Sequence, residues 1–310
     1  MGKVVEKPVG SKLKGILLIA AYLIVFTTLP YFVSSYFLSF LITLFSLVTL
    51  TSAWYILSGF AGYISLGSAA FIGIGAYVTA LIYKNVPLPL CVLFSGCIAG
   101  TIGLLLGYPI LRARGPYFII LTYGLAEFFR NAIQNWENLV EHLTGHVIFV
   151  GYLIPQIYLS IMIITLFITV LIFIIKNSRF GRGLVLIREN EDAAESMGVN
   201  TRLYKSLAFC LCGFFQGING GLLALYWSYV EPFSVFSSVY SVEVIVMAYL
   251  GGPAVYGPLL GSSVLSVVHV LLWASYPYFY LILLGIILII IVMFFSEGLS
   301  GVLRKLSKNL

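Results

Sequence analysis

The sequence has few charged residues: aspartate, glutamate, lysine and arginine make up 9% of its 310 residues, whereas 61% of the residues are hydrophobic. An average soluble chain is about one quarter charged. This chain therefore lacks the polar side chains needed to cover a water-exposed globule. The composition excludes a soluble enzyme, a secreted disulfide scaffold and a disordered chain, and it predicts an all-α integral membrane protein with many spans.

The chain also lacks the common motifs for phosphate, zinc and nucleophile sites. It contains no P-loop, HExxH or GxSxG pattern, so it does not itself hydrolyse ATP by the P-loop route. His142 and His146 are spaced to share a metal only if their stretch is helical, and an ordinary polar loop is the preferred interpretation. We expect no enzymatic activity, metal or cofactor in this chain. The four cysteines lie in apolar stretches and are interpreted as small buried hydrophobes: Cys91, Cys97, Cys210 and Cys212.

Apolar runs and the residues that interrupt them define ten candidate membrane spans. Most of the runs are long enough to cross about 30 Å of hydrocarbon at about 1.5 Å per residue. The first is interpreted as a retained span, because no small-residue cleavage site follows it. The eighth is too short for one regular span, so eight spans with re-entrant segments are the alternative. The ten candidates are 15–33, 36–57, 64–83, 88–110, 115–133, 156–175, 206–228, 241–251, 259–276 and 278–296.

Basic residues gather in four places, and these places predict the orientation. They precede the first span, follow the fourth, occupy the connection between the sixth and seventh, and follow the tenth. With ten spans all four clusters lie on one side, which the positive-inside rule assigns to the cytoplasm. The same distribution accounts for the net charge of +6 without a nucleic-acid partner. We expect one transmembrane domain over 1–310 in the cell membrane, with cytoplasmic tails at 1–14 and 297–310 and a cytoplasmic connection at 176–205.

Two glycine-rich stretches, 58–68 and 250–262, interrupt the apolar pattern at roughly corresponding places in the two halves. Unwound backbone inside a membrane is tolerated only where it lines a cavity or is buried in protein, so matching breaks point to a transport site. Tight helix packing with turns is an equally good interpretation. The translocation-path candidates from these breaks are Gly62, Ser65, Gly67, Ser68, Gly251 and Gly252.

A few polar residues inside the spans are further path candidates. Glu127 and Arg130 share a helix face and can neutralise each other, either beside the solute or as a structural ion pair. Gln216 and Asn219 either bond to a neighbouring helix or face the path, and His269 is expected to bond to a neighbouring helix. Glycines four residues apart predict close helix packing in the fourth and seventh spans: Gly96, Gly100, Gly103, Gly107, Gly213, Gly217 and Gly221.

The connection between the sixth and seventh spans carries the most informative segment. Residues 188–198 have acids in the first turn and a glycine at the end, as in a short capped helix. Asn200 or Thr201 then provides an N-cap for the seventh span. Asp192-Ala193-Ala194, three residues and Gly198 match the EAA-type pattern of ABC importer permeases. That likeness implies a coupling helix over 189–198 that docks on an ATPase, with the candidate residues Arg188, Glu189, Glu191, Asp192, Ala193, Ala194 and Gly198.

Beyond this pattern, the chain resembles the LivM-like permease subunits of branched-chain amino-acid ABC importers over nearly its whole length after the first span. The likeness adds Tyr117, Thr122 and Glu243 to the path candidates. Family members often have glutamine and histidine where Tyr63 and Ser68 stand, and a second glycine where His146 stands. The matching segments are Gly59 to Phe71 with Gly73 to Tyr77, Arg114 to Phe118 with Thr122 to Trp136, Ser178 to Arg182 with Ile187 to Glu189, and Glu243 with Leu250 to Gly252 and Gly257-Pro258.

The resemblance implies an importer subunit that moves branched-chain or other hydrophobic amino acids inward. Its implied partners are a homologous second permease subunit, two ATPase subunits, an external solute-binding protein and membrane lipid. Import of urea or short amides by the same architecture is one alternative. An ion-coupled secondary transporter is an alternative of another class, although the sequence has no intramembrane carboxylate cluster. A purely structural membrane protein fits poorly with two glycine-broken segments.

Overall fold

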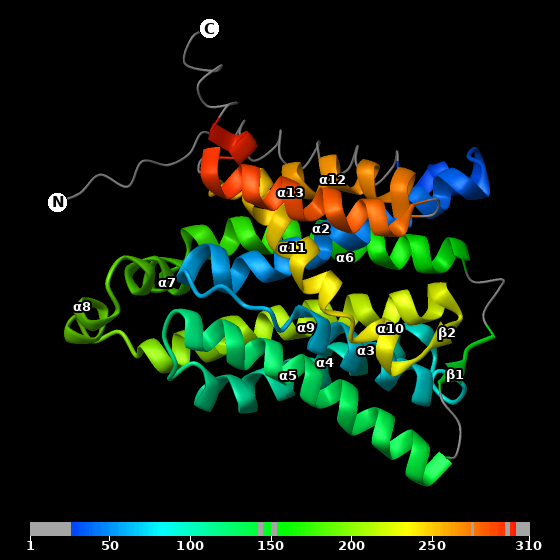
Figure 1. Cartoon of the computed structure of the whole chain (residues 1–310), viewed down its shortest axis with the longest axis horizontal. Coiled ribbons are helices and arrows are strands. Elements are labelled where there is room, and N and C mark those ends of the chain that lie inside the picture. Colours follow the sequence, from blue (N-terminus) through cyan, green and yellow to red (C-terminus); the bar gives the residue numbers. More distant parts are fainter. Residues whose placement is uncertain (1–25, 142–144, 150–153, 274–275, 295–297, 302–310) are drawn as a thin grey trace, which may run out of the picture. The chain divides into compact units, whose positions relative to one another are not determined.

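The computed structural model describes residues 26–141, 145–149, 154–273, 276–294 and 298–301 (Figure 1). Contacts along the chain divide it into two compact units, Met1–Leu41 and Ile42–Leu310. The described part of the first unit contains the short helix η1 (Leu29–Tyr31) and the start of α2 (Ser35–Ala61). Helix α2 continues into the second unit, which holds every candidate site residue.

The second unit is built from helices and one two-residue strand pair. Strands β1 and β2 are antiparallel, with His146 opposite Val230 and Val147 opposite Tyr229. After α2 the elements are α3 (Ser68–Ile82), α4 (Leu88–Ile110), α5 (Pro116–Trp136), η2 (Glu137–Glu141), β1 (His146–Val147), α6 (Ile154–Asn177), α7 (Arg179–Glu189), α8 (Glu191–Ser196), α9 (Thr201–Trp227), β2 (Tyr229–Val230), α10 (Pro232–Val235), α11 (Ser238–Gly251), α12 (Gly257–Trp273) and α13 (Pro277–Phe294).

The all-α prediction is confirmed, and each of the last nine candidate spans corresponds to a helix. Among the described residues, five helical segments are long and apolar enough to cross a membrane: α2, α4, α6, α9 and the combined stretch Pro232–Gly251. Helices α3, α12 and α13 are apolar but shorter. The first candidate, 15–33, falls largely outside the described residues. The third was expected from 64, but its helix begins only at Ser68 because 62–67 is not helical.

Helices α4 and α6 expose large apolar side chains, which water would not favour. Such surfaces suit a hydrocarbon environment, because apolar side chains there are not in contact with water. The exposed apolar residues on these two helices include Leu93, Phe94, Ile98, Leu105, Ile163, Phe167, Phe173 and Ile174. Their opposite faces pack against the rest of the second unit, so both helices have one face in protein and one suited to lipid.

The glycines of α4, α9 and α3 lie where helix backbones meet. A methyl group added at Gly217 on α9 would lie 2.4 Å from the Cβ of Ala99 on α4. One added at Gly75 on α3 would lie 2.0 Å from the carbonyl oxygen of Gly217. These contacts leave no room for any side chain, since Cβ atoms in proteins do not approach so closely. The close packing predicted from the glycine spacing is therefore confirmed.

A hydrophobic core joins α2 to α11, α12 and α13. It is formed by large apolar side chains, and their close packing stabilises the fold through many van der Waals contacts. The members include Leu47, Leu50, Trp54, Val244, Met247, Leu265, Tyr280 and Leu284.

The predicted helix over 189–198 is shorter than expected, because the chain breaks at Asn190. Asn190 has extended backbone angles, and its side chain accepts a hydrogen bond from the Ala193 amide at 3.0 Å, so it caps α8 and ends α7. At the other end Gly198 has φ +85°, as predicted. The Gly198 and Val199 amides bond back to the carbonyls of Glu195 and Ala194, which closes the helix in a Schellman motif.

The connection after α8 also differs from the prediction in one respect. Asn200 caps α9 by accepting a hydrogen bond from the Leu203 amide at 3.1 Å, as expected. Helix α9 therefore starts at Thr201, so Lys205 belongs to the helix instead of the preceding loop. Its side chain is only 2% exposed, so a lysine lies in the protein interior near the N-terminus of α9.

Candidate functional site

The two ends of the second unit differ in charge. Helices α7 and α8 lie at one end, and β1 and β2 lie at the other (Figure 1). The end with α8 collects the basic residues of the loops and helix termini that meet there. These are Arg112, Arg114, Lys176, Arg179, Arg182, Arg188, Arg202 and Lys205. We refer to this end as the basic end.

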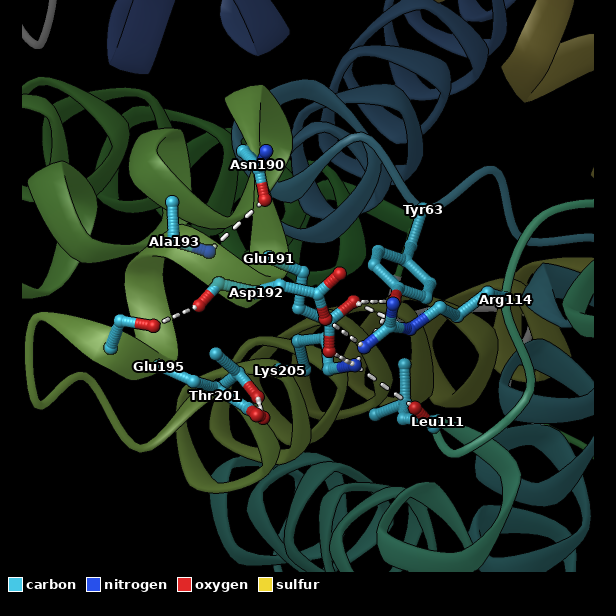
Figure 2. Close-up of polar contacts among 11 residues, drawn as sticks. Tyr63, Leu111, Arg114, Asn190, Glu191, Asp192, Ala193, Glu195, Thr201 and Lys205 are labelled. Carbon is cyan, nitrogen blue, oxygen red and sulfur yellow. Dashed lines mark hydrogen bonds and ion pairs between the residues drawn. The ribbon is translucent and has the colours of Figure 1, made fainter.

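Glu191, the first residue of α8, lies at the centre of a polar network at the basic end (Figure 2). The Lys205 ammonium group donates to Oε1 of Glu191 at 2.5 Å, and also to the Tyr63 hydroxyl and the Leu111 carbonyl at 3.0 Å each. The Tyr63 hydroxyl donates in turn to Oε2 of Glu191. Nε of Arg114 lies 3.4 Å from the same oxygen. Glu191 thus joins α8 to α9, to the loop after α4 and to the chain after α2.

This network keeps Glu191 ionised. Burial alone raises the pKa of its carboxyl, but hydrogen bonds from Lys205 and Tyr63, with the charges of Lys205 and Arg114, lower the pKa below its ordinary value. The hydrogen bond to Asp192 and the charge of Glu191 raise the pKa of Arg114. The contacts are therefore charge-assisted hydrogen bonds, which are stronger than neutral ones.

The remaining coupling candidates divide into those that face inward and those that face outward. Asp192 is exposed and accepts a hydrogen bond from Nη2 of Arg114 at 2.9 Å. Ala193 is exposed, whereas Ala194 is fully buried within the chain. Of the two alanines of the EAA-type pattern, only Ala193 is therefore open to a partner. Arg188 donates to the Gly59 carbonyl at 3.1 Å and lies 3.5 Å from its neighbour Glu189.

The first glycine-rich break is an unwound segment held by side chains. Residues 62–67 are not helical, and Gly62 has φ +77°. The indole of Trp54 donates to the Ser65 carbonyl at 2.8 Å. Thr122 accepts from the Leu66 amide at 3.0 Å, and Ser241 donates to the Leu66 carbonyl at 2.8 Å. Helices α2, α5 and α11 thus supply the partners that a helix would otherwise provide internally.

Other residues of this break are held from nearby. The Gly67 amide donates to the Ser65 hydroxyl at 3.1 Å. Ser68, the first residue of α3, accepts from Nε2 of Gln216 at 2.9 Å. The same Gln216 nitrogen lies 3.4 Å from the Leu50 carbonyl. Five path candidates, which are Gly62, Ser65, Gly67, Ser68 and Thr122, are therefore gathered on or against this segment, and Gln216 joins them from α9.

The second glycine-rich break is a tight turn between packed helices. Gly252 ends α11 with φ +86°, and α12 returns from Gly257. A methyl group at Gly251 would lie 1.8 Å from the Gly257 carbonyl oxygen, and one at Gly261 would lie 1.8 Å from that of Met247. Here the glycines allow two helices to touch.

The two breaks meet at a cavity of about 240 Å³ near the basic end. Gly62 and Gly252 both line it, together with Arg188 from α7. A second cavity of about 250 Å³ lies beside the first break and is lined by Gly62, Ile64, Phe118 and Arg188. The unwound segment therefore borders open space as well as side chains.

Four further path candidates lie away from these cavities. Tyr117 is 73% exposed on α5. Glu127 and Arg130 form the predicted ion pair, with Ser238 at 3.5 Å from Glu127 and the Phe233 ring 5.3 Å from the Arg130 guanidinium. Asn219 donates to Ser46 on α2 at 2.8 Å, so it bonds to a neighbouring helix.

The last candidate, Glu243 on α11, is 1% exposed, and its Oε1 lies 3.0 Å from Nδ1 of His269 on α12. The predicted bond from His269 to a neighbouring helix is therefore confirmed.

Several residues of the site were missed by sequence reasoning. Lys205 was grouped with the basic loop, although a lysine inside the apolar start of a span could have marked it as buried. Ser241 and Trp54 carry no motif and are found only from their contacts. Tyr63 was noted only as a departure from the family, although its hydroxyl bonds to Glu191. Ser68, the other departure at this break, was already a path candidate, and it bonds to Gln216.

At the end opposite α8, another buried carboxylate was missed. Glu137 is fully buried; its Oε1 accepts from the Tyr77 hydroxyl at 2.8 Å, and its Oε2 accepts from the Gly145 amide at 3.2 Å. His146, the third departure, lies 3.5 Å from the same carboxylate. His142 lies outside the described residues. Within the described residues, no three histidine, cysteine or acidic side chains gather as metal ligands.

Comparison with known proteins gives a consistent result. The model of the family described as "Branched-chain amino acid transport system / permease component" matches residues 36–292. The LivM permease protein of the high-affinity branched-chain amino acid transport system of Escherichia coli K12 is 26% identical over 335 aligned positions, which cover 95% of this chain and 77% of LivM. LivM of Salmonella typhimurium LT2 is 25% identical, with the same coverage. No solved structure matches the chain.

Proposed function

Because the chain belongs to the family of branched-chain amino acid permease components, we propose that it is a membrane-spanning subunit of an ABC importer for branched-chain and other hydrophobic amino acids. In this proposal it works with a homologous second permease subunit, two ATPase subunits and an external solute-binding protein. The family is described as a permease component of a branched-chain amino acid transport system, and both relatives are named as permease proteins of a high-affinity system of that kind.

The proposed topology has ten spans in the cell membrane, with both termini and α8 in the cytoplasm. The distribution of basic residues supports it, since they collect at the end that carries α8. The opposite end, with β1 and β2, would then face the solute-binding protein. This orientation puts α8 within reach of a cytosolic ATPase.

The observation that carries the proposal is the attachment of α8 to the first break. Helix α8 projects an exposed edge with Asp192 and Ala193, while its first residue, Glu191, bonds to Tyr63 at the start of the unwound segment. A push on α8 would therefore act directly on residues 62–67. Helices α2, α5 and α11 hold that segment, so its displacement would move these helices as well. A shift of the helices between an inward-open and an outward-open arrangement is what alternating access requires.

The solute is proposed to pass along the side of the bundle that holds the path candidates. The unwound backbone at 62–67, the cavity between the two breaks and the buried polar side chains of α9 and α11 support this route.

The test is purification of the chain from its natural membrane, followed by reconstitution in vesicles. We expect two ATPase subunits and a second permease to co-purify, and leucine uptake to require ATP and solute-binding protein. Uptake should persist when an ionophore collapses the ion gradients. Loss of uptake with the ionophore while ATP is present, or ATP-driven uptake of urea but not leucine, would refute the proposal.

A further inference from the structure

A cavity of about 400 Å³ lies beside the end of α9, α10 and the first turns of α11. Pockets for small ligands are typically about 300–1,000 Å³ and mostly apolar, with a few placed polar groups. The wall of this cavity has that character, because it is formed largely by aliphatic and aromatic side chains of α2, α9, α11 and α12. The main apolar members are Leu47, Leu50, Leu223, Trp227, Tyr240 and Trp273.

Glu243 places one carboxylate at this apolar wall. Its Oε1 lies 3.0 Å from Nδ1 of His269, whose ring stacks on Trp273 at 5.3 Å between centroids. Its Oε2 is buried and makes no hydrogen bond of ordinary geometry with any described residue, although the Tyr280 hydroxyl lies close enough to interact with the carboxylate. A buried carboxylate oxygen without a donor is costly, so a bound cation or donor would stabilise it.

The first turn of α11 borders the same cavity through Ser237 and Val239. Ser237 caps α11 without a side-chain hydrogen bond to the helix. The Tyr240 amide donates to the Ser237 carbonyl at 3.2 Å, so the first-turn amides without a partner inside the helix are those of Ser238 and Val239. A helix N-terminus favours an anion. Val239 and Glu243 are four residues apart on one helix face, about 6 Å along the axis. The cavity therefore offers a positive end and a negative group at the spacing of a small zwitterion, beside an aliphatic wall.

We propose that this cavity binds the amino acid in transit. The carboxylate of Glu243, oriented by His269, accepts hydrogen bonds from the solute's ammonium group. The N-terminus of α11 receives the solute's carboxylate, and the leucines of α2 and α9 contact its apolar side chain. The inference rests on the function proposed above and adds the place and the group that recognise the solute.

The experiment uses the complete transporter in vesicles, carrying Ser237→Cys as a reporter inside the cavity, with the chain lacking this cysteine as the labelling baseline. Ser237 is half-buried and lines the cavity. The rate of modification by a small thiol reagent is measured with leucine, with 4-methylpentanoate, which is leucine without its ammonium group, and with urea. Leucine is expected to slow modification, whereas 4-methylpentanoate and urea leave the rate unchanged.

Glu243→Gln in the same reporter chain is expected to raise the leucine concentration needed for half-protection by about tenfold or more, because one charge-assisted hydrogen bond to the ammonium group is lost. Ser266→Ala is the matched control, because this buried serine on α12 bonds only within its own helix. The inference is overturned if a transporter that imports leucine shows no protection by leucine, if 4-methylpentanoate protects equally, or if Glu243→Gln leaves protection unchanged. A transporter that imports no leucine at all would instead refute the proposed function. The comparison of the three solutes uses the reporter chain with Glu243 intact, so it does not depend on the stability of the Glu243→Gln variant.

Discussion

At the first glycine-rich break the backbone leaves the helix for residues 62–67, and side chains of Trp54, Thr122 and Ser241 take over its hydrogen bonds. At the second break the chain leaves the helix only for the turn 252–256, and the helices on either side, α11 and α12, press their backbones together through Gly251 and Gly261. The two stretches are similarly rich in glycine. Glycine therefore serves in one place to unwind a chain and in the other to bring two helices into contact.

The side chains around a glycine-rich break thus decide what the break does. An unwound segment inside a membrane needs donors and acceptors from other helices, and the first break has them. It is also the one attached to α8, through Tyr63 and Glu191. We therefore expect changes at the first break to impair coupling and changes at the second to impair packing.

The largest effect is expected from Lys205→Met, which leaves Glu191 without its ammonium partner. Removing one member of a buried ion pair typically costs about 3–5 kcal/mol. Uptake by the reconstituted transporter should fall below detection, and thermal unfolding of the purified chain should shift to lower temperature. The double variant Glu191→Gln/Lys205→Met buries no charge and should recover stability but not uptake.

Lys84→Met is the control for this pair, because Lys84 is exposed. It should leave both stability and uptake unchanged. Normal uptake by the Lys205→Met transporter would show that α8 does not act through this network.

Gly261→Ala probes the second break. The added methyl would lie 1.8 Å from the Met247 carbonyl oxygen, so α11 and α12 must separate. Overpacking of this kind costs about 1–3 kcal/mol. We expect Gly261→Ala to unfold at a lower temperature than the parent chain. The molecules that remain folded should take up leucine with the same ATP coupling as the parent. Gly285→Ala on α13 is the matched control, since nothing lies within 4 Å of its added methyl. Equal unfolding temperatures for the two variants would remove the packing role of Gly261.

Thr122→Val tests the hold on the unwound segment. It removes the acceptor of the Leu66 amide while keeping the size of the side chain. The loss of one hydrogen bond costs about 1 kcal/mol. Because the segment is then less firmly held, we expect ATP hydrolysis to become partly uncoupled from uptake, measured as more ATP consumed per leucine imported. Thr101→Val, an exposed threonine that bonds only to its own helix, should leave this ratio unchanged.

The smallest effect is expected from pH. The folded-state pKa of Glu191 is lowered, so its network stabilises the protein fully above the ordinary glutamate value and is lost as pH falls through the folded value. The difference in unfolding temperature between the parent chain and Glu191→Gln should therefore be constant near neutral pH and shrink in acid. A difference that grows in acid would contradict the assignment.

Much of the fold was predictable because membrane spans are long, apolar and bounded by charges. That α4 and α9 each pack closely against another helix followed from glycine spacing, although the spacing did not show that they pack on each other. The caps of α8 and α9 followed from Gly198 and Asn200. These features depend on residues near each other in sequence. Their physical cause is local, so the sequence alone shows them.

The parts that could not be predicted depend on residues far apart in the chain. Tyr63, Glu191 and Lys205 belong to three elements, and nothing in their spacing reveals that they meet. The break of the expected helix at Asn190 reflects the capping preference of asparagine, which the acidic pattern beside it masked. The unlike roles of the two glycine-rich stretches likewise arise from side chains contributed by other helices.

In the proposed importer, α8 contacts the ATPase on the cytosolic side. A photo-activated cross-linking residue in place of Ala193, which is exposed on α8, tests it directly in the assembled transporter. The same residue in place of Phe149, which is 83% exposed and follows β1 by two residues, is the control. We predict a cross-link from position 193 to an ATPase subunit and none from position 149. A cross-link from position 193 to the external solute-binding protein, or the absence of any link to the ATPase, would contradict the account.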